Sequence, residues 1–109
     1  MTFIKDINQT PEHKQKCNCG SWKNHWVKFN TDRLLWPTIC AVRNCKEPAY
    51  KVAHVKIVDP YDVQWHLIPL CKGHYEDHKN GEYLDIDDNK GSFANNQDIT
   101  CKQPFLPIP

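Results

Sequence analysis

Alternating apolar and polar positions predict two strands in the middle of the chain. Over residues 49–58 the apolar side chains are mostly small or β-branched and alternate with polar ones, a pattern typical of a strand. Asp59-Pro60 interrupts this run, and residues 65–70 form a second, more continuously apolar run. We therefore expect the two runs to pair as a β-hairpin.

Helical patterns lie on both sides of this hairpin. Ser21 is a favourable N-cap, and the ring-bearing positions after it recur at helical spacing, which predicts a short amphipathic helix over residues 21–30. The residues on this face are Trp22, His25, Trp26 and Phe29. We interpret these rings as core rather than as base-stacking residues, because aromatic side chains dominate small cores. A second helix is expected over residues 72–79, closed by Asn80-Gly81.

The two ends of the chain carry weaker patterns. Residues 1–16 are polar and interrupted by Pro11, which suggests a mobile or loosely docked arm. Residues 82–86 suggest a short strand, and the proline-rich residues 104–109 suggest an extended tail. Between the arm and the tail we expect a single domain over residues 17–103.

Composition indicates that this domain needs more than a hydrophobic core. A chain of 109 residues, 39% hydrophobic and 25% charged, can bury only one modest core, and its six cysteines are candidates for an additional staple. No apolar run resembles a signal peptide or a membrane span, so we expect a cytoplasmic protein without a membrane partner. In that reducing compartment, cysteines interspersed with six histidines favour metal binding over disulfides.

Four of these residues have the spacing of a zinc site. Cys40 and Cys45 lie five positions apart in a turn before the hairpin, and Cys71 and His74 lie where the second strand gives way to the following helix. Structural zinc takes four Cys or His ligands, usually as two local pairs. The helix N-terminus also favours a thiolate. We predict a structural Zn²⁺ held by these four residues in a small α+β domain.

A second zinc site is suggested by the remaining cysteines. Cys17 and Cys19 lie just before the first predicted helix, which carries His25, and Cys101 lies near the end of the chain. Together they would supply four ligands and fasten both ends of the chain to its centre. The Cys-x-Cys spacing is less usual than Cys-x₂-Cys for zinc.

Over residues 40–79, the turn with Cys40 and Cys45, the hairpin and the following helix resemble a treble-clef domain of the HNH endonuclease type. The segments that carry the resemblance are Ala53-His54-Val55 and Leu67-Ile-Pro-Leu-Cys71-Lys-Gly-His74. The resemblance implies cleavage of nucleic acid with a divalent ion such as Mg²⁺ or Mn²⁺. It implies that His54 is the general base, that His66 occupies the family's Asn position, and that His78 is the helical metal ligand. Ala53 and Tyr75 depart from the pattern, because the family carries metal ligands at both positions.

Two functions remain open on these observations. The first is an HNH-like nuclease. The second is a non-catalytic zinc module that binds nucleic acid or a protein partner through its N-terminal half. Residues 1–36 carry six basic and three acidic side chains, whereas residues 80–109 carry two and five, so the front of the chain is the more anion-attracting part. A metalloprotease is excluded, because Tyr75 stands where the Glu of His-Glu-x-x-His would follow the first histidine.

Overall fold

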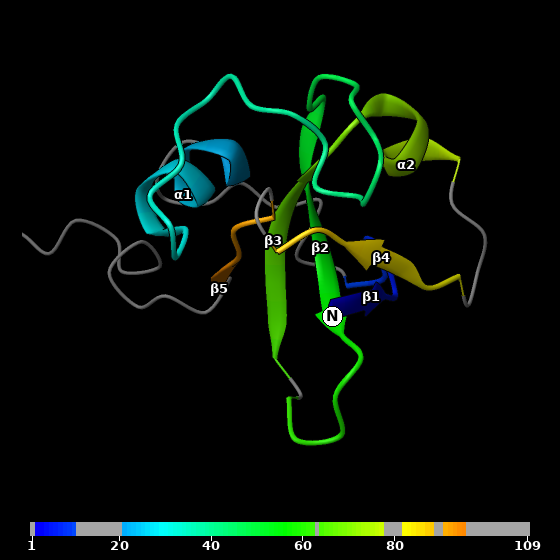
Figure 1. Cartoon of the computed structure of the whole chain (residues 1–109). Coiled ribbons are helices and arrows are strands. Elements are labelled where there is room, and N and C mark those ends of the chain that lie inside the picture. Colours follow the sequence, from blue (N-terminus) through cyan, green and yellow to red (C-terminus); the bar gives the residue numbers. More distant parts are fainter. Residues whose placement is uncertain (1, 11–20, 63, 78–81, 89–90, 96–109) are drawn as a thin grey trace, which may run out of the picture.

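The part of the chain that the structure describes forms one antiparallel sheet with two helices beside it (Figure 1). The structure, a computed structural model, describes residues 2–10, 21–62, 64–77, 82–88 and 91–95. The elements are β1 (Thr2–Lys5), α1 (Trp22–Phe29), β2 (Lys51–Ile57), β3 (Trp65–Leu70), α2 (Lys72–Glu76), β4 (Leu84–Ile86) and β5 (Ala94–Asn95). The strand order is β4-β1-β2-β3-β5.

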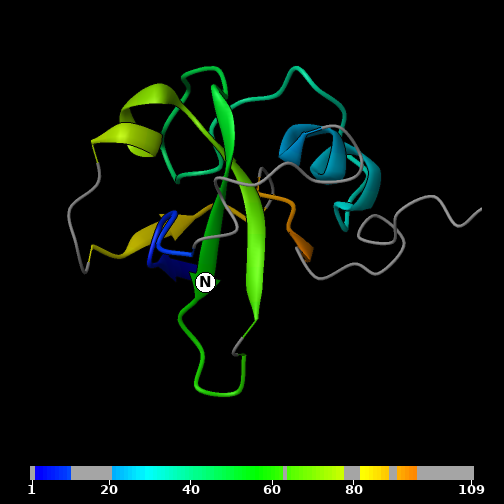
Figure 2. The same cartoon turned by 180° about the vertical axis from the view of Figure 1, so that it is seen from behind.

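The hairpin of β2 and β3 is the centre of this sheet. Its antiparallel register runs from Lys51 opposite Leu70 to Lys56 opposite Trp65. The prediction of a hairpin from the two apolar runs is confirmed by this pairing. Seen from either side, α1 and α2 lie on opposite flanks of the hairpin (Figure 1, Figure 2).

Each face of the hairpin covers a separate hydrophobic core. The first core comprises Ile4, Ile7, Cys40, Ala41, Val42, Ala53, Val55, Ile68, Leu70, Cys71, Leu84 and Ile86. The second core comprises Trp26, Val52, Leu67 and Ala94, with Trp22, Val27, Phe29, Leu34 and Trp36 packed against it. Because successive strand residues point to opposite faces, β2 and β3 supply side chains to both cores. The metal-ligand candidates of the central site belong to the first core.

The start of the chain is part of the sheet. We expected an arm over residues 1–16, and this expectation is wrong for the described residues 2–10. Strand β1 pairs with both β2 and β4, and Ile4 and Ile7 are buried in the first core. This strand has only four residues, so its own sequence gives little alternation. Its long-range partners fix it in place.

Helix α1 carries the rings of the second core. Ser21 caps it by accepting a 3.1 Å hydrogen bond from the backbone N–H of Asn24. Trp26 is fully buried, and its indole N–H donates a 2.7 Å hydrogen bond to the carbonyl of Ser92. The described part of α1 therefore presents its largest ring to the protein interior.

The remaining elements are shorter than the sequence suggested. Helix α2 ends at Glu76, within the predicted range 72–79, and β4 covers Leu84–Ile86 of the predicted range 82–86. The predicted proline-rich tail, residues 104–109, lies outside the described residues. Among the described residues, no helix has the length and apolar character needed to cross a membrane.

Candidate metal centre

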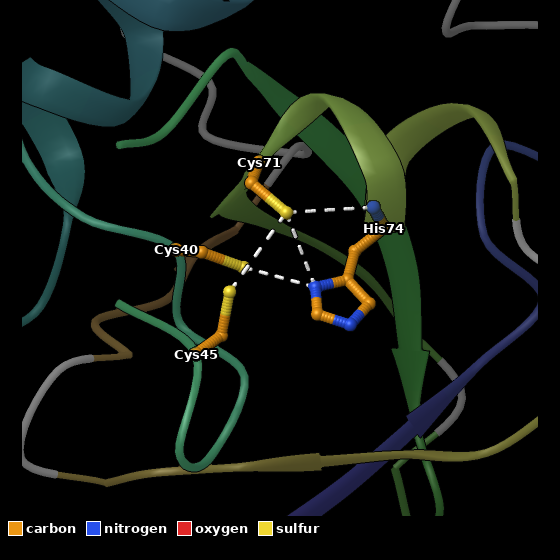
Figure 3. Close-up of side chains that lie close together, drawn as sticks. All are labelled: Cys40, Cys45, Cys71 and His74. Atoms are coloured by element: carbon orange, nitrogen blue, oxygen red, sulfur yellow. Dashed lines mark hydrogen bonds between the residues drawn. The ribbon is translucent and has the colours of Figure 1, made fainter. Parts of the chain in front are cut away.

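The first ligand pair lies in a tight turn, the knuckle, which we define as residues 38–48. The backbone N–H of Cys40 donates a 2.9 Å hydrogen bond to the carbonyl of Glu47, and that of Cys45 donates a 3.1 Å bond to Val42. Asn44 has a φ of 65°, a left-handed conformation that asparagine tolerates better than most residues. This turn brings the two cysteines of the pair to the same side of the loop (Figure 3).

The second pair lies where β3 passes into α2. Cys71 directly follows β3 and is the N-cap of α2, and its Sγ accepts a hydrogen bond of 3.5 Å from the backbone N–H of His74. His74 lies three residues further on, so its ring returns toward the sulfur. The helix start therefore positions both ligands at once.

The four candidate donor atoms converge on one point. The three Sγ atoms and a ring nitrogen of His74 all lie within 4.8 Å of one another. Nδ1 of His74 lies 3.4 Å from Sγ of Cys40 and 3.3 Å from Sγ of Cys71, and the sulfurs of Cys45 and Cys71 are 3.9 Å apart (Figure 3).

These distances fit a tetrahedral zinc ion. Zn–S and Zn–N bonds of ordinary length place two sulfurs about 3.8 Å apart, and a sulfur and a nitrogen about 3.6 Å apart. The three separations given above lie within about 0.3 Å of those values. Three soft thiolates and one imidazole are also the donor set that zinc prefers. A metal ion such as zinc therefore fits the residues present.

Burial favours the protonated form of the Cys40 thiol. Cys40 is fully buried and Cys71 nearly so, whereas Cys45 and His74 are half-buried. Desolvation raises the pKa of the Cys40 thiol to about 12, although hydrogen bonds from the backbone at Val42 and Cys71 oppose the rise. At neutral pH this thiol keeps its proton unless a cation replaces it.

The knuckle is also fastened to the sheet through its main chain. The N–H of Ala41 donates a 3.1 Å hydrogen bond to the carbonyl of Pro69 in β3, and the N–H of Arg43 donates a 2.8 Å bond to Asp85 in β4. The Arg43 guanidinium also lies 3.0 Å from a carboxylate oxygen of Asp85. The first ligand pair is thus held against the strand that delivers the second.

The proposed second zinc site falls mostly outside the described residues. Cys17, Cys19 and Cys101 all lie outside them. His25 is described and fully buried in α1, where its ring contacts Trp22 at 5.4 Å and Phe29 at 4.8 Å between ring centres. The second site therefore stays a prediction.

The histidines of the HNH resemblance are not brought together in the described structure. His54 is buried in β2, with its ring 4.4 Å from that of Trp22, on the face that α1 covers. His66 pairs with Val55, the next residue along β2, so its side chain points to the opposite face. His78 lies outside the described residues. The HNH resemblance implies that His54 and His66 act at one site, whereas the register places them on opposite faces of the hairpin.

His66 has a partner that the sequence analysis did not single out. Its Nε2 lies 3.0 Å from both carboxylate oxygens of Asp62, and its ring contacts Phe93. Burial raises the pKa of Asp62, but the hydrogen bonds from His66 and the Gln64 backbone, with the charge of His66, outweigh it and hold the pKa below its ordinary value. Asp62 lies in the loop before β3 and His66 lies in β3. Their spacing of four residues brings side chains together in a helix, but it predicts no contact between a loop and a strand.

The two departures from the HNH pattern have structural roles. Ala53 is fully buried in the first core, where a metal-ligating carboxylate would displace apolar contacts. Tyr75 is half-buried against the same core and contacts the ring of Tyr50. Both positions therefore serve packing in this chain.

Comparisons of the chain with protein-family models, with curated proteins and with solved structures returned no match. The inference of a metal site at Cys40, Cys45, Cys71 and His74 therefore depends on the distances between their donor atoms alone.

Proposed function

We propose that this chain is a zinc-binding module in which the knuckle, the β2–β3 hairpin and α2 form a treble-clef-like frame around a structural ion. The observation that carries the proposal is the convergence of four soft donor atoms, all within 4.8 Å of one another, from two segments far apart in the sequence. Protonated thiols have little reason to gather in this way, because each is a weak hydrogen-bonding group.

The proposed role of the ion is structural rather than catalytic. Catalytic zinc sites keep one coordination position open for water or substrate, whereas four protein ligands close the tetrahedron. Cys40 and Cys45 would be joined through the ion to Cys71 and His74. The ion would thus link the knuckle to the end of the hairpin, as disulfides or metal ions do in other small domains.

Elemental analysis of protein purified without added metal tests this proposal. We expect about one zinc per chain from the central site. Cys45→Ser should lose that zinc; Cys45 is half-buried, so serine there disturbs the core less than it would at Cys40. A wild-type protein that is folded and carries no zinc at neutral pH would overturn the proposal.

The same measurement tests the second predicted ion. A value of two zinc ions per chain, reduced to one by Cys101→Ser, would assign the other ion to Cys17, Cys19, His25 and Cys101. A value of one that Cys101→Ser leaves unchanged would limit the metal to the central site. Cys101→Ser is thus also the matched control for Cys45→Ser.

We do not extend the proposal to nuclease chemistry. The general base of that hypothesis, His54, is buried beneath Trp22, and His66 points to the other face of the sheet. A base must reach a water molecule beside the scissile phosphate, which a buried ring does not do. Cleavage of plasmid DNA with Mg²⁺ or Mn²⁺, lost in a folded His54→Ala variant, would restore the enzyme hypothesis.

A further inference from the structure

An aromatic pair lies on the surface beside the metal centre. Tyr50 directly precedes β2, and Tyr75 belongs to α2, one residue after the ligand His74. Their ring centres are 5.8 Å apart and the rings meet edge to face at 79°. Tyr50 is 40% exposed, so part of this pair faces solvent.

Two lysines converge on this pair. Nζ of Lys51 lies 5.1 Å from the centre of the Tyr50 ring and 5.8 Å from that of Tyr75. Nζ of Lys72 lies 6.0 Å from the centre of the Tyr50 ring. Both lysines are exposed, so their charges remain available to a ligand. The acidic residues of this segment, Glu76 and Asp77, directly follow Tyr75 at the end of α2.

The tryptophan-rich segment around α1 offers less to a ligand. Trp26 is fully buried in the second core, and Trp22 and Trp36 are partly buried against it, with Nζ of Lys23 5.7 Å from the centre of the Trp36 ring. These rings contribute to the packing of the second core. Tyr50, in contrast, combines an exposed ring with two ammonium groups.

We propose that Tyr50, Tyr75, Lys51 and Lys72 form a platform that binds single-stranded nucleic acid. An unpaired base stacks on the exposed part of Tyr50, and the neighbouring phosphates pair with the two lysines. Aromatic rings flanked by positive charge are the combination that binds single strands without base specificity. In a duplex the base faces are stacked inside the helix. Its phosphates can therefore pair with the lysines, but its bases cannot stack on Tyr50.

The platform depends on the proposed function for its geometry. The chain reaches Tyr50 from the knuckle, whereas Tyr75 and Lys72 belong to α2, and the proposed zinc ion joins these two segments. The zinc content of every sample must therefore be measured beside its affinity for nucleic acid.

Fluorescence anisotropy with labelled oligo(dT) and oligo(U) of about 15 nucleotides tests the platform, because such lengths span a typical single-strand site. We expect both probes to bind at low salt, a duplex of the same length to bind more weakly, and affinity to fall as salt rises. Tyr50→Ala should weaken binding about ten-fold, whereas Tyr50→Phe, which keeps the ring, should bind as the wild type does. Lys51→Gln and Lys72→Gln should each reduce the salt dependence.

Tyr61→Ala is the matched control, because Tyr61 is 94% exposed but lies in the loop after β2, at the other end of the hairpin. Equal affinities for the Tyr50→Ala and wild-type proteins, or no binding of either probe by the zinc-loaded protein, would overturn the platform and leave the zinc module intact. A protein that is folded, carries no zinc as purified and still binds both probes through Tyr50 would overturn the zinc module and the platform's dependence on the ion, and would leave Tyr50 as the binding residue.

Discussion

The two sides of the hairpin are stabilised by different means. We call the knuckle, α2 and the adjoining end of the hairpin the metal end. There, α2 has five residues and the knuckle contributes only isolated bridges. The second core instead buries the large Trp26 ring under an eight-residue helix. The knuckle and α2 have little regular structure of their own, although they adjoin the larger first core, so a metal cross-link is proposed there, whereas one large ring supplies much of the smaller second core.

Polar side chains complete the second core. The amide oxygen of Asn30 accepts hydrogen bonds from the Leu34 N–H at 2.7 Å and the Ser92 hydroxyl at 2.9 Å. Its amide nitrogen donates to the carbonyls of Trp26 at 2.8 Å and Leu34 at 3.0 Å. This buried side chain joins the end of α1 to the following loop and to the segment before β5.

Removing the metal is expected to have the largest effect. Zinc binding to small metal domains releases about 10–16 kcal/mol, which matches or exceeds the whole stability of a typical domain. A strong chelator at neutral pH should therefore unfold the metal end, seen as loss of near-UV circular dichroism, and zinc should restore it. Unchanged spectra after complete chelation would contradict this difference between the two regions.

Truncation of Trp26 is expected to have the second largest effect on stability. Trp26→Ala removes a fully buried ring and should cost about 3–5 kcal/mol in the free energy of unfolding, measured in urea. Trp26→Phe keeps most of the ring but loses the hydrogen bond to Ser92, so it should cost less. If the two regions are stabilised separately, the folded Trp26→Phe protein should retain the wild-type zinc content.

Asn30→Ala should cost about 1–3 kcal/mol, because it leaves the buried partners of the amide without their hydrogen bonds. Ser21→Ala, at the opposite end of the same helix, should cost about 1 kcal/mol through loss of the N-cap alone. Urea unfolding of both variants measures the difference. An Asn30→Ala cost no larger than that of Ser21→Ala would show that the polar network adds little.

The Asp62–His66 pair, which joins the β2–β3 loop to the start of β3, should have the smallest effect. The pKa of Asp62 is lower in the folded chain, so its stabilisation is present above the unfolded value, about 3.9, and is lost as the pH falls through the lower folded value. Asp62→Asn should lower stability by under about 1 kcal/mol at neutral pH, since both side chains are partly exposed. Melting temperatures of the two proteins should converge in acid. A difference that persists unchanged at pH 2 would contradict this origin.

Local sequence patterns predicted the metal end well. Cys40 and Cys45 form a pair within the knuckle, and Cys71 and His74 form a pair at the start of α2. Each half of the site therefore depends on residues that are close in sequence. The hairpin between them closes the distance, and its strands were visible in the apolar runs. Short-range rules therefore sufficed for these four residues.

Long-range pairing could not be predicted in the same way. Strand β1 has no helix-like or strand-like period of its own, and it is defined by β2 and β4. The residues from Val52 to Val55 are all buried, so hydrophobicity alone does not say which of them faces which core. The opposite orientations of His54 and His66 follow from the register, which only the paired strands reveal.

The position of Cys71 provides a spectroscopic reporter. Its sulfur faces the other three donors and also accepts the backbone N–H of His74. A thiolate attracts that proton more strongly than a thiol does, so metal binding should shift the His74 amide resonance downfield and slow its exchange with solvent. One nuclear magnetic resonance signal in α2 would then measure how much of the protein is loaded with metal.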